Sequence, residues 1–113
     1  METRTVPRPA NRLDPVKQIV REHRALAILR IVNRQVGRAS NDGVLTDCLK
    51  LFGLTCGHEE LRAEIDALER EGLLTVERTA DIHVLELTRR GVEVADGIII
   101  VEGVERPQPD CPY

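Results

Sequence analysis

The sequence of 113 residues contains very few aromatic side chains: one Phe, one Tyr and no Trp. Proteins that bind single-stranded nucleic acid stack bases on exposed aromatic side chains, so this composition argues against that class. Long apolar runs are also missing: residues 98–101 form a run far shorter than the roughly 20 residues that a membrane-spanning helix needs. No signal peptide is recognisable. We therefore expect a protein without a membrane partner.

Cysteine is scarce and irregularly spaced, at positions Cys48, Cys56 and Cys111. An odd number without Cys-x-x-Cys spacing indicates reduced thiols in a cytoplasm. Cys56 and His58 stand close together, but a tetrahedral metal site needs a second such pair. Motifs of phosphate loops, nucleophile elbows and zinc proteases are absent. The sequence predicts no metal site, no cofactor and no catalytic residue, and hence a protein that is not an enzyme.

Charge is distributed unevenly along the chain, although the net charge is only −3. Residues 1–56 contain ten bases and five acids, a net charge of +5. Residues 57–113 contain six bases and fourteen acids, a net charge of −8. Two interpretations are open. The two poles are solvated faces of opposite bias, or one pole meets nucleic acid or the opposite pole of a second copy.

Residues 1–13 carry two prolines and three arginines with little that could be buried, a composition typical of a flexible basic arm. Asp14 and Pro15 then predict the N-cap and the first residue of a helix. The folded domain is expected over residues 14–101. Residues 102–113 contain three prolines and are predicted to form an extended tail outside the core.

Apolar residues at helical spacing predict a first helix that ends just before Gly37, its left-handed stop. His23 lies on the apolar stripe of this helix and is expected to be a core residue. The capping residues 40–42 predict the start of a second helix, which closes at Gly53. A third helix is predicted over residues 58–71. Two helices joined by so tight a turn form a helix-turn-helix unit.

The pattern then changes to alternation, and residues 74–78 and 82–87 predict a hairpin. A hairpin directly after a helix-turn-helix is a wing. Thr88 is expected to cap a short last helix that ends near Gly97, and residues 98–101 are expected to pack as an extended strand. The sequence thus predicts a mainly α fold with a small β-hairpin wing, an α+β winged helix-turn-helix.

The third predicted helix combines the position of a DNA-reading helix with an unfavourable charge. It holds six acids against two bases, a net charge of −4. Affinity for DNA depends largely on neutralising phosphates, so position and charge point to different functions. The carboxylates are expected on a solvated face, where pairs such as Asp66 with Arg70 neutralise them in part.

Duplex DNA stays open as a partner, because other bases are available. The candidate nucleic-acid-binding residues are Arg4, Arg8 and Arg12 of the arm, His58 and Arg62 of the third helix, Arg78 of the wing, and Arg89 and Arg90 of the last helix. Arg89 and Arg90 fall in the first turn of a helix, where the helix dipole disfavours cations. They are either held by another contact or simply solvated.

Two resemblances follow from short motifs. The sequences LEREGL at 68–73 and LTRRG at 87–91 resemble motifs of winged-helix regulators of the MarR and ArsR type. The opening helix at 21–30, the stretch at 41–45 and the Gly-Val-x-Arg-Pro tail at 103–107 look like those of small winged-helix proteins encoded in Mu-like phages and prophages. This resemblance implies a phage-encoded, DNA-associated or regulatory protein in the cytoplasm of a bacterial host.

These observations lead to one hypothesis and one alternative. We expect a winged-helix protein that binds double-stranded DNA as a homodimer and regulates transcription, since a symmetric site doubles the few contacts of one domain. The arm, with a net charge of +2, is expected to contribute more affinity than the third helix. The alternative is an adaptor that binds a phage or host protein through the acidic third helix and the tail.

Overall fold

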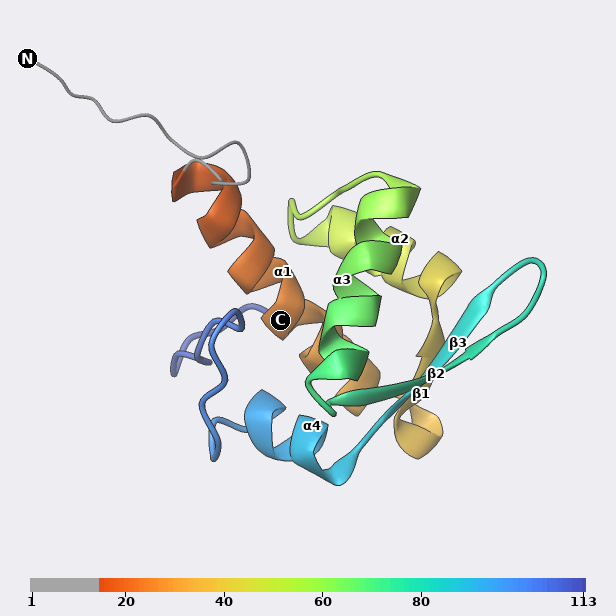
Figure 1. Cartoon of the computed structure of the whole chain (residues 1–113). Coiled ribbons are helices and arrows are strands. Elements are labelled where there is room, and N and C mark those ends of the chain that lie inside the picture. Colours follow the sequence, from red (N-terminus) through yellow and green to blue (C-terminus); the bar gives the residue numbers. More distant parts are fainter. Residues whose placement is uncertain (1–14) are drawn as a thin grey trace, which may run out of the picture.

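The computed structural model describes residues 15–113, which form four α-helices and three β-strands (Figure 1). In chain order these are α1 (Pro15–Asn33), β1 (Ala39–Asn41), α2 (Asp42–Leu51), α3 (His58–Arg70), β2 (Leu74–Arg78), β3 (His83–Leu87) and α4 (Arg89–Ala95). The strands form one antiparallel sheet in the order β1-β3-β2. The predicted α+β fold class is confirmed, and the element order is compatible with a winged helix-turn-helix. Among these residues, no helix has the length and apolar character to cross a bilayer.

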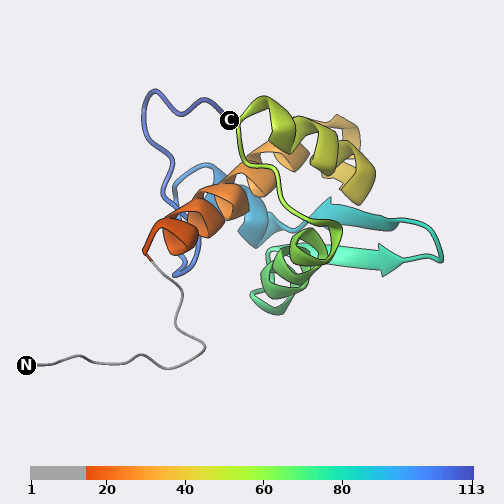
Figure 2. The same cartoon turned by 90° about the horizontal axis from the view of Figure 1, so that it is seen from above.

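Helix α1 provides the centre of the core. The four consecutive side chains of residues 26–29 are all buried, and α2 and α4 both pack against this helix. Figures 1 and 2 show α1 crossing the middle of the domain, with its first turns projecting beyond the other elements. Val16 and Ile19 in those first turns are exposed. The apolar stripe of α1 therefore meets the core from the partly buried Val20 onward.

The helix-turn-helix unit is formed by α2, a short turn and α3. The Asn41 side chain caps α2 by accepting from the backbone N–H of Val44 at 2.9 Å. Gly53 takes a left-handed φ of 70° directly after α2, as the sequence predicts. Helix α3 begins at His58 after Gly57, which offers no side-chain cap. Leu61, Ile65 and Leu68 fix the orientation of α3, because all of them are buried against the core.

The wing is the hairpin of β2 and β3. The two strands pair from Leu74 opposite Leu87 to Arg78 opposite His83, which confirms the predicted hairpin. Strand β1 adds a third strand by pairing along the other edge of β3. The sequence pattern did not predict β1, because three residues are too few to show an alternation.

Two predicted boundaries were wrong. Helix α1 ends at Asn33, and Gly37 (φ 72°) lies in a separate 3-10 turn at Val36–Arg38. Residues 98–101 do not form a strand. The backbone N–H of Ile98 instead closes α4 by donating to the carbonyl of Glu93 at 2.8 Å. Of residues 98–101 only Val101 is buried, whereas Ile98 and Ile100 are exposed.

The C-terminal segment was predicted to stay outside the core, and this was wrong. It contains no helix or strand, yet Val104 and Tyr113 are buried. The Tyr113 ring packs edge-on against Phe52 at a centroid distance of 5.4 Å, and its hydroxyl hydrogen-bonds to the ring of His23. His23 also lies 3.4 Å from the Glu105 carboxylate. His23 is thus a half-buried residue with two polar partners, at the place where the tail joins α1.

Candidate interaction site around helix α3

Helix α3 presents three different sides to its surroundings, because residues three and four apart share one side of a helix. We call them the wing side, the crest and the groove side. The wing side carries Arg62, Asp66 and Glu69, the crest carries Glu59, Ala63 and Arg70, and the groove side carries Glu60, Glu64 and Ala67. The crest is exposed, and the two other sides face neighbouring elements.

On the groove side, a buried ion pair joins α3 to α1. The Arg24 guanidinium contacts the carboxylate of Glu64, and each of these side chains is only 5% exposed. Arg24 also donates to the carbonyl of Leu54 at 2.9 Å and lies 3.4 Å from the Glu60 carboxylate. One arginine of α1 therefore ties down both the turn before α3 and the helix itself.

Burial opposes the charge of both partners, but their mutual attraction outweighs burial only for Arg24. Burial raises the pKa of Glu64 above its ordinary value, and the attraction of Arg24 offsets this only in part. Burial also works against the charge of Arg24, but the hydrogen bond and the charge of Glu64 raise the pKa of the guanidinium. Arg24 thus stays charged, while the Glu64 carboxylate carries an uncompensated cost of desolvation.

On the wing side, Arg62 is bound to α2. Its guanidinium donates to the carboxylate of Asp42 at 3.0 and 2.9 Å, and the backbone N–H of His83 donates to the other oxygen of Asp42 at 3.3 Å. Asp42 is 1% exposed. Its burial opposes the charge, but Arg62 and His83 hold the pKa of the carboxyl below its ordinary value. Asp42 therefore connects α2, α3 and β3.

Further along the same side, Arg78 binds the wing to α3. Its guanidinium donates to Asp66 at 2.6 Å and to Glu69 at 2.8 Å. The hydrogen bond from Arg78 lowers the pKa of Glu69, and the two carboxylates raise that of Arg78. Asp66 was expected to pair with Arg70, and this was wrong, because the wing brings Arg78 closer.

These contacts account for an acidic helix at this position. Four of its five acids face a guanidinium from another element: Glu60 and Glu64 face Arg24, and Asp66 and Glu69 face Arg78. The expectation of one solvated acidic face was therefore wrong. Arg24 lies in the basic first half of the chain and its two partners in the acidic second half. The two poles of the sequence thus meet partly within one molecule.

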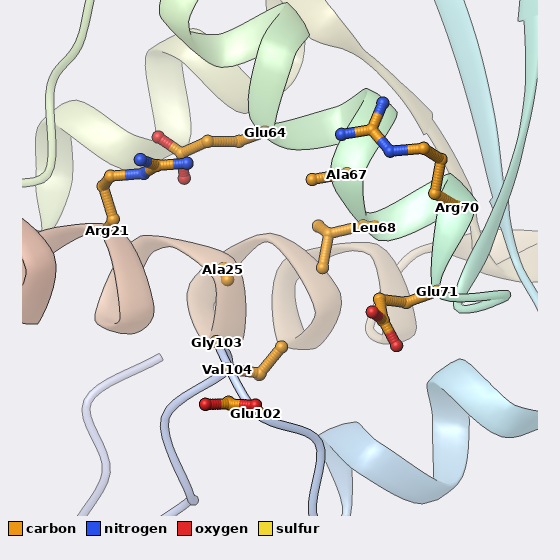
Figure 3. A pocket seen from close by; sticks show the side chains of 10 residues that line it. All are labelled: Arg21, Ala25, Glu64, Ala67, Leu68, Arg70, Glu71, Glu102, Gly103 and Val104. Atoms are coloured by element: carbon orange, nitrogen blue, oxygen red, sulfur yellow. The ribbon is translucent and has the colours of Figure 1, made fainter. Parts of the chain in front are cut away.

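Behind α3 lies a groove of about 220 Å³, bounded by α1, α3 and the segment before Val104 (Figure 3). Its apolar lining comes from Ala25, Ala67, Leu68 and Val104, and its charged lining from Arg21, Arg70, Glu64, Glu71 and Glu102. In Figure 3, Arg21 and Glu64 lie on one side of the groove, Glu71 lies on the other, and Glu102 lies below Val104. Within residues 15–113, no three potential metal ligands cluster.

Two known proteins are similar to this chain. It is 37% identical over 94 residues to uncharacterized protein gp26 of Escherichia phage Mu, an alignment that covers 83% of this chain and 97% of gp26. The chain belongs to the phage Mu gp26 family. The second similar protein is an uncharacterized protein of Haemophilus influenzae. It is 31% identical to this chain over 75 residues, an alignment that covers 66% of this chain and 72% of that protein. No family model and no solved structure matches the chain.

The predicted relationship to a protein of phage Mu is confirmed. Both relatives are described as uncharacterized, so their names do not indicate a function for the gp26 family. Of the residues predicted to contact DNA, His58, Arg62 and Arg78 lie along one side of α3. The ring of His58 is 4.0 Å from Asp42, so His58 and Arg62 share one carboxylate. All three bases thus lie close to acids of the same chain.

The remaining predicted residues of this gp26-family chain lie elsewhere. Arg90 donates to the backbone carbonyl of Glu71 at 3.2 Å, and Arg89 is exposed 4.0 Å from Glu93. Of the two alternatives that the sequence left open, Arg90 thus has another contact, whereas the Arg89 side chain is 94% exposed and solvated. Arg4, Arg8 and Arg12 lie outside the described residues.

Sequence reasoning missed the residues that anchor the site, namely Arg24, Asp42 and Glu64. A signal for Arg24 was present, because a base stands there within the apolar stripe of α1, between Val20 and Ile28. Such a base has to find an acceptor when it is buried. Its partner could not be named, because Glu64 is 40 residues away in the sequence.

Proposed function

We propose that this protein is an adaptor that binds a basic partner protein through the crest of α3 and the neighbouring wing, in the cytoplasm of a bacterium that carries a Mu-like phage. The observation that carries the proposal is the engagement of Arg62 and Arg78 by Asp42, Asp66 and Glu69. Their charge is matched within the chain. The proposed role is one of binding and not of catalysis.

Electrostatics favours a basic partner over DNA at this face. Between residues 58 and 83 the chain has eight acids and three bases, and two of those bases are the engaged Arg62 and Arg78. A duplex would bring phosphates toward this excess of carboxylates, with little counterion release to compensate. A lysine- or arginine-rich protein surface would meet complementary charge instead.

Duplex DNA binding as a homodimer is the second candidate, and transcriptional regulation is the role it would serve. It is favoured by the element order of a winged helix-turn-helix and by the net charge of +2 on residues 1–13. In this case the arm would supply the phosphate contacts, and a symmetric dimer would double them. Deleting residues 1–12 would then remove most duplex affinity and flatten its dependence on salt.

Opposite substitutions of Ala63 test the two candidates at one position. Ala63 is exposed on the crest and takes part in none of the ion pairs, and both Arg and Glu are good helix formers. Fluorescence anisotropy would compare the full chain and both variants on a labelled generic duplex and a labelled lysine- and arginine-rich peptide, at two salt concentrations. The same two substitutions at Val36, which is 98% exposed in the turn before β1, provide the matched control.

For an adaptor, Ala63→Glu should strengthen peptide binding and Ala63→Arg should weaken it, each by about twofold to fivefold, as for exposed ion pairs. The Val36 variants should leave peptide binding unchanged. Duplex binding that Ala63→Arg strengthens and Ala63→Glu weakens, without any response to the peptide, would contradict the adaptor and support DNA recognition by α3.

A further inference from the structure

The groove behind α3 contains a buried carboxylate oxygen that lacks a hydrogen-bond donor. Glu64 uses its Oε2 atom to accept from Arg24, whereas Oε1 is inaccessible to solvent and has no partner among the described residues. The whole Glu64 side chain is 5% exposed. A buried acceptor without a donor costs on the order of 1–3 kcal/mol, and more when it is charged. An N–H group that donated to Oε1 would therefore remove this cost.

The shape and lining of the groove favour one long, basic side chain. Its volume of about 220 Å³ is below the roughly 300–1,000 Å³ of ordinary ligand pockets, which argues against a nucleotide or an organic cofactor. Its apolar lining suits an aliphatic stem, and two carboxylates border it, that of Glu71 on the side away from Arg21 and that of Glu102 below Val104 (Figure 3). Long basic side chains bury such stems while their charged heads seek an acceptor.

The charge of one neighbouring group acts on the same carboxylate. Arg21 is exposed on α1 and lines the groove, and its positive charge acts to lower the pKa of Glu64, although burial dominates and raises it; Arg21 makes neither a hydrogen bond nor an ion pair with Glu64. The Arg70 guanidinium is turned away from Glu71 and Glu102 in Figure 3. A second guanidinium that reached Glu64 would therefore be repelled by the like charge of Arg21, and Arg70 would not block its path.

We propose that this groove is the socket for one arginine or lysine side chain of the partner protein. The side chain enters between Glu71 and Glu102, its stem packs on Leu68 and Val104, and its N–H donors bind Oε1 of Glu64. The assignment rests on the proposed function, because it supplies the anchor residue by which α3 would hold a basic partner. Arginine is among the residues that most often provide such an anchor.

The test uses N-acetyl-argininamide as the probe, titrated into the isotope-labelled full chain and followed by amide chemical shifts. We expect shifts to concentrate at Ala25, Leu68 and Val104. Arg21→Gln should tighten binding by about twofold to fivefold, because it removes the repelling cation, and Glu102→Gln should weaken it by a similar factor. Asp47→Asn removes an exposed carboxylate from α2, which does not line the groove, and should change nothing. None of these three side chains belongs to the Arg24–Glu64 pair.

Other outcomes would overturn the socket. Shifts spread evenly over the acidic surface, no shifts at all, or weaker binding in Arg21→Gln would each do so. The last result, together with tight binding of acetate, would indicate an anion site. The Ala63 variants and the basic peptide test the adaptor independently. If they respond as expected while the groove variants are silent, the proposed function stands and only the socket fails.

Discussion

Replacing Glu64 with Ala should destabilise the domain strongly, because it leaves the Arg24 guanidinium buried without its carboxylate. Removing one partner of a buried ion pair costs about 3–5 kcal/mol. A domain of this kind has a free energy of unfolding of roughly 5–15 kcal/mol, so a large share of it would be lost. Glu64→Gln should cost less, on the order of 1–3 kcal/mol, because the amide oxygen still accepts from Arg24.

Urea denaturation followed by far-UV circular dichroism measures these differences without relying on fluorescence, since the chain has no Trp. The unfolding midpoint should fall in the order wild type, Glu64→Gln, Glu64→Ala. Combining Arg24→Met with Glu64→Leu should recover part of the loss of Glu64→Ala, because no charge then stays buried and only the carbonyls of the turn lose a donor. A double variant less stable than Glu64→Ala would refute the reasoning.

The same variants carry a signature in pH. Because the pKa of Glu64 is raised in the folded state, the folded chain binds this proton more tightly than the unfolded chain. The contribution of Glu64 to stability is therefore largest below the ordinary value of 4.5 and falls as the pH rises above it. Glutamine does not titrate. The free energy of unfolding of the wild type, relative to that of Glu64→Gln, should accordingly be higher at acidic than at neutral pH. The opposite trend would contradict the direction of the pKa shift.

Three further predictions concern other parts of the fold. Leu68→Ala should cost about 2–5 kcal/mol in the free energy of unfolding, since Leu68 is buried, and an unchanged urea midpoint would place Leu68 outside the core. Gly91→Ala should cost about 1–3 kcal/mol by the same assay, because a Cβ at Gly91 would meet the carbonyl oxygen of Leu73 at 2.2 Å; full stability would mean that the start of α4 can shift freely. Asp42→Asn should destabilise the domain above pH 3.8 and progressively less below it. Although burial opposes the charge of Asp42, Arg62 lowers the pKa of the carboxyl in the folded state, so its stabilising effect is lost as the pH falls; a constant difference in midpoint would exclude this role.

The helices and the wing could be predicted from the sequence because their signals are local. The alternation over residues 74–87 and the cap Thr88, which accepts from the N–H of Gly91 at 3.0 Å, each lie within a few residues of the structure they specify. The end of α1 was misplaced because Gly37, a strong stop signal, lies inside the separate 3-10 turn that follows the helix and does not end the helix itself.

The site could be predicted much less well, because it depends on contacts between distant residues. Charge counting identified α3 as acidic but did not show that Arg24 and Arg78 approach it from α1 and the wing. The proline-rich composition of residues 102–113 correctly excluded a helix. It could not reveal that Tyr113 packs against Phe52, since burial of a single aromatic ring leaves no periodic pattern.

The three attachments of α3 also restrict how this helix could change during evolution. In a domain whose exposed helix is held by apolar contacts alone, surface residues can be exchanged one at a time to alter the target. Here Glu64, Asp66 and Glu69 are each the partner of a guanidinium on another element, so a substitution toward a basic helix would at once release a cation elsewhere. For Glu64 that cation is the buried Arg24, so the order of the substitutions matters. Arg24 would have to be replaced before Glu64, and this change in α1 would itself bring no new binding property.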